Sequence, residues 1–217
     1  MKIIFLCGEL DPGRDSVGEY VRCLSEELIH QGHHVAIASI NDTYIELMQN
    51  SGLLGPAELS VLRLPSNLAE EDRVALARVF IDSFNPDWIS LQFVPSAFHH
   101  NGLAFGLGGK LLTAGNGRKW EVMFHELWKG ISAKAGKMEK LFGRFQFALI
   151  RSMIKKLNPK VVHTHNDVYQ KELERIGTAA KLLPQFFRTD LSAKPNYTEV
   201  AKQFFLDLPD EPNLNAE

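Results

Sequence analysis

The sequence is poor in cysteine, has no long apolar run and carries little excess charge of either sign. Its 217 residues include only Cys7 and Cys23, which form neither a metal pair nor the disulfide framework of a small secreted domain. A formal net charge of -2 gives no reason to expect a nucleic-acid partner. Glu9 interrupts the apolar start, and no apolar stretch approaches the ~20 residues needed to cross a bilayer. We therefore expect a cytoplasmic globular protein.

Apolar segments with strand character alternate with segments that have helical periodicity. This alternation predicts an α/β fold, a Rossmann-like doubly wound parallel sheet, with ligands outside the carboxyl ends of the strands. The predicted strands are 2–7, 34–39, 61–64, 87–94, 119–125, 160–165 and 180–183. The predicted helices are 16–31, a short piece at 44–49, 70–84, 103–114, 132–157, 168–176 and 198–208.

The first forty residues contain a strand, a glycine-containing loop and a helix. Ser16 and Glu19 have the spacing of a capping box, so we place the start of the helix at Ser16. The glycines, Gly8, Gly13 and Gly18, fit two interpretations. Exposed amides and the positive end of the helix would attract a phosphate group. Alternatively, the glycines only allow a tight turn and a close approach of helix and sheet.

The same stretch resembles the start of glycosyltransferases with the two-domain GT-B fold, in their family 4-like amino-terminal domain. The resemblance rests on Gly8, Gly13, 16–20, the leucines of 24–28 and Gly32-His33-His34-Val35, and it extends loosely from Met1 to about Asp190. It implies that this half mainly binds the acceptor, while the glycine loop touches the diphosphate of the donor. The donor nucleotide would lie mostly in a second, carboxyl-terminal domain.

Polar residues follow several predicted strands at their carboxyl ends, which a doubly wound sheet gathers at one edge. By the resemblance, His125 contacts the transferred sugar or the acceptor, and it is our candidate catalytic residue. Many relatives have Asp where this chain has Glu126, so the resemblance does not give the role of Glu126. His125 is alternatively a core or loop histidine. The candidate residues for binding donor phosphate or acceptor are Gly13, Ser16, Gly18, Gln92, Glu126, His165 and Asn166.

Three further hypotheses remain beside this one. His163 and His165 lie on one side of a predicted strand and could bind a metal with His125, although the resembled family needs no metal in this half. Asp42 after the second strand favours a nucleotide-cofactor oxidoreductase, but the glycine spacing does not match its fingerprint. The chain is alternatively a binding module without catalysis. We expect no cofactor, only a nucleotide-sugar as co-substrate.

The segment 129–160 contains nine basic residues and one acid, Glu139. On a helix over 132–157, the basic residues form one stripe, which is commonly a solvated face. The stripe would also suit weak peripheral contact with an anionic membrane or a lipid-linked acceptor. The stripe contains Lys137, Lys140, Arg144, Arg151 and Lys155, and we expect Met138, Phe142, Phe145, Leu149 and Met153 on the opposite, apolar side.

From residue 191 the sequence changes, because prolines and asparagines surround one helical piece. We expect residues 1–190 to form the Rossmann-like domain, and 191–217 to be a linker or the start of a missing donor-binding domain. The resemblance then implies a retaining glycosyltransferase of the hexosyltransferase type, acting on an unknown acceptor. Catalysis would need both domains, so we expect this chain alone to be inactive.

Overall fold

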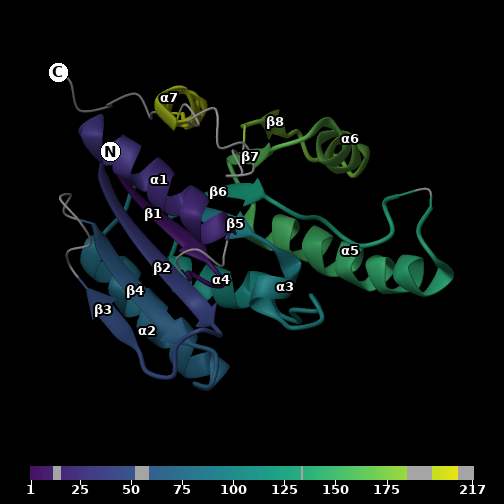
Figure 1. Cartoon of the computed structure of the whole chain (residues 1–217), viewed down its shortest axis with the longest axis horizontal. Helices are drawn as coiled ribbons and strands as arrows, with labels where there is room; N and C mark the ends of the chain where they lie inside the picture. The colour runs from purple at the N-terminus through teal and green to yellow at the C-terminus, as the bar shows by residue number, and fades with distance from the viewer. Residues whose placement is uncertain (12–15, 52–58, 133, 185–196, 210–217) are drawn as a thin grey trace.

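A computed structural model describes residues 1–11, 16–51, 59–132, 134–184 and 197–209, which contain one eight-stranded sheet with helices on both faces (Figure 1). The strand order is β3-β4-β2-β1-β5-β6-β7-β8, and the predicted Rossmann-like doubly wound fold is confirmed. All neighbouring strands are parallel except β3 and β4, because β3, a short edge strand that the sequence pattern did not predict, pairs antiparallel with β4. The strands are β1 Lys2–Cys7, β2 His34–Asp42, β3 Gln49–Ser51, β4 Ser60–Pro65, β5 Trp88–Phe93, β6 Lys119–Phe124, β7 Val161–Thr164 and β8 Lys181–Leu182.

The central strand, β1, is covered on both faces, which explains why its residues from Ile3 to Cys7 are all apolar. Alternation along the strand sends Ile4 and Leu6 to one face and Ile3, Phe5 and Cys7 to the other. Each of these side chains is at most 1% exposed. Burial of apolar surface on both faces therefore fixes the middle of the sheet.

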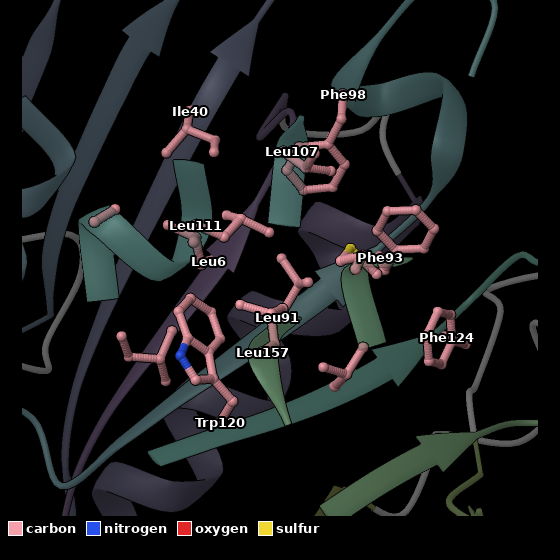
Figure 2. Close-up of a cluster of buried hydrophobic side chains, with 14 of the residues drawn as sticks. Leu6, Ile40, Leu91, Phe93, Phe98, Leu107, Leu111, Trp120, Phe124 and Leu157 are labelled. Atoms are coloured by element: carbon pink, nitrogen blue, oxygen red, sulfur yellow. The ribbon is translucent and has the colours of Figure 1, made fainter. Parts of the chain in front are cut away.

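The helices divide between the two faces. Helices α1 and α7 cover the face that carries Ile3 and Phe5, whereas α2, α4 and α5 cover the other (Figure 1). Figure 2 shows the core on the face covered by α2, α4 and α5. There, Leu111 of α4 and Leu157 of α5 lie with strand residues such as Leu91 and Trp120. The helices are α1 Ser16–His30, α2 Glu70–Phe84, α3 Pro95–Phe98, α4 Leu107–Gly115, α5 Lys137–Leu157, α6 Asp167–Arg175 and α7 Tyr197–Asp207.

Two predicted helices begin later in the structure than the sequence pattern suggested. Helix α4 begins at Leu107 instead of 103, because Gly106 has a left-handed backbone with φ of 74°, which a right-handed helix cannot include. Helix α5 begins at Lys137 instead of 132, because Gly136 is extended with ψ of 164°. Both corrections concern glycines, whose backbone conformation side-chain periodicity does not reveal.

The predicted short helix at 44–49 is wrong. The backbone amide of Tyr44 donates to the carboxylate of Asp42, which turns the chain immediately after β2. Gln49–Ser51 then pair antiparallel with β4 and form the edge strand β3. An Asx-type turn and a strand partner therefore replace the weak helical pattern.

Helix α7 packs against α1 and adds Val200, Ala201 and Phe204 to the core on that face. The ring of Phe204 lies 5.7 Å from that of Phe5, between ring centroids. The proposed boundary between residues 190 and 191 stays a prediction. Within the described residues, no helix has the length and apolar character that crossing a bilayer requires.

Candidate functional site

The loop after β1 packs closely on the short helix α3, which follows β5. A Cβ atom at Gly8 would collide with the backbone of Ala97, and the carbonyl of Gly8 accepts from the Asn41 amide at 2.8 Å. Gly8 is therefore needed for close packing here. Ser16 is the first residue of α1 and is exposed, and Gly18 is buried. Gly13 lies outside the described residues, so its role in phosphate binding stays a prediction.

Gln92 lies near the carboxyl end of β5, and His125 directly follows the neighbouring strand β6. The structure brings the two side chains into direct contact. Nε2 of His125 lies 2.8 Å from Oε1 of Gln92. Both residues are buried, His125 with 4% and Gln92 with 1% of its surface exposed. Tyr20 of α1 packs edge-on against the His125 ring with centroids 5.4 Å apart. The predicted gathering at the carboxyl edge is thus observed for this pair. Burial of His125 means that a ligand reaches the ring only if the elements around it open.

Glu126 and Asn166 line an open groove of about 600 Å³ beside this pair. The groove lies between the segment after β6 and the first turn of α6. Its walls combine the exposed carboxylate of Glu126 and the amide of Asn166 with the rings of Trp128 and Tyr169. Burial and the charge of Glu126 raise the pKa of Tyr169. The remaining lining residues are Leu127, Lys129, Gly130, Ile131, Ser132, Glu139 and Val168.

His165 lies next to this groove, on the first residue after β7. The side-chain amide of Asn166 donates to its Nε2 at 3.0 Å, and the Tyr169 ring packs edge-on at 5.5 Å. Burial lowers the pKa of His165, and a hydrogen bond with the backbone of Phe124 opposes this only partly. Neutral imidazole is therefore favoured. Asn166 also accepts from the Tyr169 amide and caps α6, so it has a structural task as well.

A buried ion bridge lies behind the site, and the sequence analysis missed it. His163 of β7 contacts Glu121 of β6 through Nδ1 at 2.9 Å and Asp207 of α7 through Nε2 at 3.1 Å. Lys181 completes the bridge at the surface with a 2.6 Å contact to Asp207. Burial lowers the pKa of His163, but the hydrogen bonds and charges of Glu121 and Asp207 outweigh burial and raise it.

The ion bridge bears on the metal hypothesis, because carboxylates engage both nitrogens of His163. Within the part of the chain that the structure describes, no group of three or more potential ligands is placed to hold a metal ion. A signal for the bridge was present in the sequence, since Glu121 is an acid among the apolar residues that follow Lys119 in β6. The partners of Glu121 in the bridge, His163 and Asp207, lie 42 and 86 positions later in the sequence, so the spacing of residues could not predict the bridge.

Asp42, which favoured an oxidoreductase, is committed to structural contacts. Its Oδ2 accepts from Arg63 Nε at 2.8 Å and from Ser39 Oγ at 3.0 Å, and its Oδ1 accepts from the Tyr44 amide at 3.1 Å. The carboxylate is completely buried. Because the carboxylate is buried under these three donors, a ribose hydroxyl could reach it only if the surrounding side chains moved, which disfavours binding of a dinucleotide at this residue.

Gln146 is a second site residue that the sequence analysis missed, because it lies among apolar residues on α5. Its Oε1 accepts from the Lys129 amide at 2.8 Å, and its Nε2 donates to the Asn101 carbonyl at 3.3 Å. Gln146 is 2% exposed and holds both the loop after β5 and the wall of the groove. Helix α5 therefore positions the groove through a polar side chain.

The predicted basic stripe of α5 is exposed along its length. The expected apolar side was wrong, because Met138 is 76% and Phe145 54% exposed, whereas Met153 is buried. The helix buries a neighbouring face instead, and this leaves exposed apolar residues beside the basic ones. A smaller groove of about 370 Å³ next to the first is lined by Lys129, Lys140, Arg144 and Arg175 with Trp128 and Phe147. The buried residues of α5 are Gly143, Gln146, Ile150, Met153 and Leu157.

Comparison with known proteins finds no matching family model and no matching curated protein. Among solved structures, the chain is similar to an alpha-glucosyltransferase in complex with UDP, at 14% identity and a TM-score of 0.45, over 90% of this chain and 42% of that one. It is also similar to a UDP-glucose 4-epimerase with NAD from Thermus thermophilus, at 13% identity and a TM-score of 0.42, over 76% and 54%. An acetyl xylan esterase has 14% identity and a TM-score of 0.43, over 95% and 98%. The neighbours thus include transferases and Rossmann enzymes that bind NAD, and likenesses this low carry no argument about the reaction.

Proposed function

We propose that this chain is the acceptor-side half of a two-domain retaining glycosyltransferase, which transfers a hexosyl group from a nucleotide-sugar to an acceptor. The observation that carries the proposal is the groove of about 600 Å³ at the carboxyl edge of the sheet. Glu126 and Asn166 line it, and His125 directly precedes Glu126. Its volume is that of a small-molecule site, and its place is where doubly wound sheets bind ligands.

The groove has the chemistry that a sugar acceptor needs. The Glu126 carboxylate accepts hydrogen bonds from hydroxyl groups, and the Asn166 amide both donates and accepts. Trp128 and Tyr169 offer ring surfaces for the apolar faces of a sugar. The resemblance in sequence assigns His125 to the same place. A positive helix end at α1 would face the diphosphate of a donor held by the second domain.

Asp42, the residue that favoured an oxidoreductase, is engaged by Arg63, Ser39 and Tyr44, so it supports that hypothesis less than the sequence suggested. The binding-module hypothesis differs from ours in one measurable respect, which is transfer by the complete protein. In a two-domain enzyme, positioning of donor and acceptor supplies about 7–11 kcal/mol of barrier reduction at most, and half of the cleft cannot supply it. The isolated chain should therefore show little or no transfer.

The test is a sugar-transfer assay on the complete natural protein with a panel of nucleotide-sugars and acceptors, repeated for this chain alone. Glu126→Gln should reduce transfer at least tenfold, whereas Glu174→Gln, an exposed carboxylate on α6 outside the groove, should leave it unchanged. His125→Ala should remove most activity. Because His125 is buried, circular dichroism must first show that this variant folds.

Robust transfer by the chain alone would refute the domain argument. Equal rates for the Glu126 and Glu174 variants would move the acceptor away from this groove. A complete protein that transfers no sugar but binds one would support the binding-module hypothesis instead.

A further inference from the structure

A continuous chain of buried hydrogen bonds connects the ion bridge to His125. It begins at Glu121, whose Oε2 accepts from the Ser90 hydroxyl at 2.5 Å. The Ser90 oxygen in turn accepts from Nε2 of Gln92 at 2.7 Å. Oε1 of Gln92 then meets Nε2 of His125 at 2.8 Å. These residues lie on one face of β5 and β6, where each is at most 4% exposed.

This chain of hydrogen bonds has a direction, which the donor and acceptor atoms of its side chains determine. Glu121 accepts two hydrogen bonds, because its Oε1 also takes one from His163. A carboxylate can only accept, so the single hydroxyl proton of Ser90 must point at Glu121. The Ser90 oxygen is then an acceptor toward Gln92, and the NH₂ group of Gln92 points at Ser90. The carbonyl oxygen of Gln92 consequently faces His125.

This direction determines which nitrogen of His125 carries a proton. An amide oxygen has no hydrogen to donate, so Nε2 of His125 must be the donor in the 2.8 Å contact. In the neutral ring, Nδ1 is then the basic nitrogen. The opposite tautomer would need Gln92 to flip. After a flip, the Gln92 oxygen would face the Ser90 oxygen. Either the two oxygens would then have no hydrogen between them, or the Ser90 proton would turn to Gln92 and leave the buried Glu121 oxygen without its donor, and both are costly.

The ion bridge holds Glu121, the first residue in this chain of hydrogen bonds, in place. His163 is completely buried between Glu121 and Asp207, and its two ring nitrogens each face a carboxylate. Two carboxylate acceptors require two N–H donors, which is the imidazolium form. The positive ring lies directly against the carboxylate of Glu121, and both residues are completely buried, so each charge has its partner inside the protein.

We propose that Glu121 is a positioning residue, which holds His125 in the Nε2-protonated tautomer through Ser90 and Gln92 and thereby makes Nδ1 its proton acceptor. The value of this tautomer for sugar transfer rests on the proposed function. The tautomer itself does not, and it can be measured without any substrate.

The test is ¹⁵N NMR of the imidazole nitrogens in the whole chain, with signals of His125 assigned by comparison with His125→Gln. In the wild type, the protonated-nitrogen resonance should belong to Nε2. Ser90→Ala removes the group that orients the Gln92 amide, so a resonance of protonated Nδ1 should appear. Ser90→Thr keeps a hydroxyl group and should restore the wild-type pattern. Ser25→Ala is the matched control, because Ser25 is also completely buried but its hydroxyl has no hydrogen-bond partner among the described residues.

A wild-type His125 protonated on Nδ1 would overturn the proposal, and this measurement needs no variant to fold. Ser90→Ala spectra identical to wild type would also overturn it. If the tautomer responds as expected while the complete protein transfers no sugar, the positioning role stands and the proposed function fails. If sugar is transferred and the tautomer does not respond, the reverse holds.

Discussion

Gly143 of α5 provides a sharp test of how the groove is held in place. A Cβ atom added there would collide with the backbone carbonyl of Lys129, which belongs to the wall of the groove. A backbone carbonyl cannot rotate away as a side chain can. Gly143→Ala must therefore separate the wall of the groove from α5. The Lys129 amide would then also lose its hydrogen bond with Gln146.

Two opposing effects set the magnitude. Alanine in a helix gains about 0.4–1 kcal/mol over glycine, chiefly because the unfolded chain has fewer states. Overpacking costs about 1–3 kcal/mol, and a backbone collision lies at the upper end. Gly143→Ala should therefore destabilise the fold by about 2 kcal/mol. At about 2–4 °C per kcal/mol for a chain of this size, the melting temperature should fall by about 4–8 °C.

Gly109→Ala is the matched control, because a Cβ atom at Gly109 of α4 would meet nothing closer than the flexible amine of Lys156 at 3.6 Å. This variant should be stabilised by up to about 1 kcal/mol. Urea unfolding followed by circular dichroism measures both changes. The same sign for the two variants would refute the packing argument, and a stable Gly143→Ala protein would show that the groove wall moves at little cost.

Two other predictions concern charge. Burial lowers the pKa of His163, but Glu121 and Asp207 raise it above 6.5 in the folded state, so its stabilising contribution is full below pH 6.5 and is lost as pH rises through the folded value. The difference in unfolding free energy between the wild type and His163→Gln should accordingly shrink as pH rises above 6.5, and a difference that stays constant with pH would contradict the charged bridge. The exposed bases of α5 should give weak co-sedimentation with anionic vesicles that salt abolishes, since charge attraction is screened over ~8 Å at physiological ionic strength. Reversing Lys137, Lys140 and Arg144 to Glu should remove it, whereas absent binding at low salt would leave these residues as a solvated face.

Most of the fold could be predicted from the sequence because the strands of a doubly wound sheet are buried on both faces. Largely apolar segments such as Ile3–Cys7 and Trp88–Phe93 are then local signals, and alternation with helices determines the topology. Predictions failed where backbone conformation decided the outcome, as at Gly106 and Gly136. They failed again at 44–49, where a side chain turns the chain.

The candidate site was predictable only in part. The gathering of Gln92, His125, Glu126 and Asn166 follows from topology, because parallel strands end at the same edge. The buried bridge does not follow from topology, since Asp207 reaches His163 only through the packing of α7. The buried face of α5 was also misjudged, because Gln146 occupies a buried position through hydrogen bonds with two loops. Periodicity counts apolar residues and cannot detect a polar residue with buried partners.

The docking of α7 has a consequence for the order in which the protein folds. Helix α1 is made early, yet its outer partner α7 is separated from it by more than 160 residues of chain, so this contact closes a very long loop. Until α7 arrives, His163 has only one of its two carboxylates and Phe5 lacks the ring of Phe204. During synthesis, the sheet must therefore wait in an incomplete state with apolar surface exposed, and chains that end before α7 should depend most on chaperones.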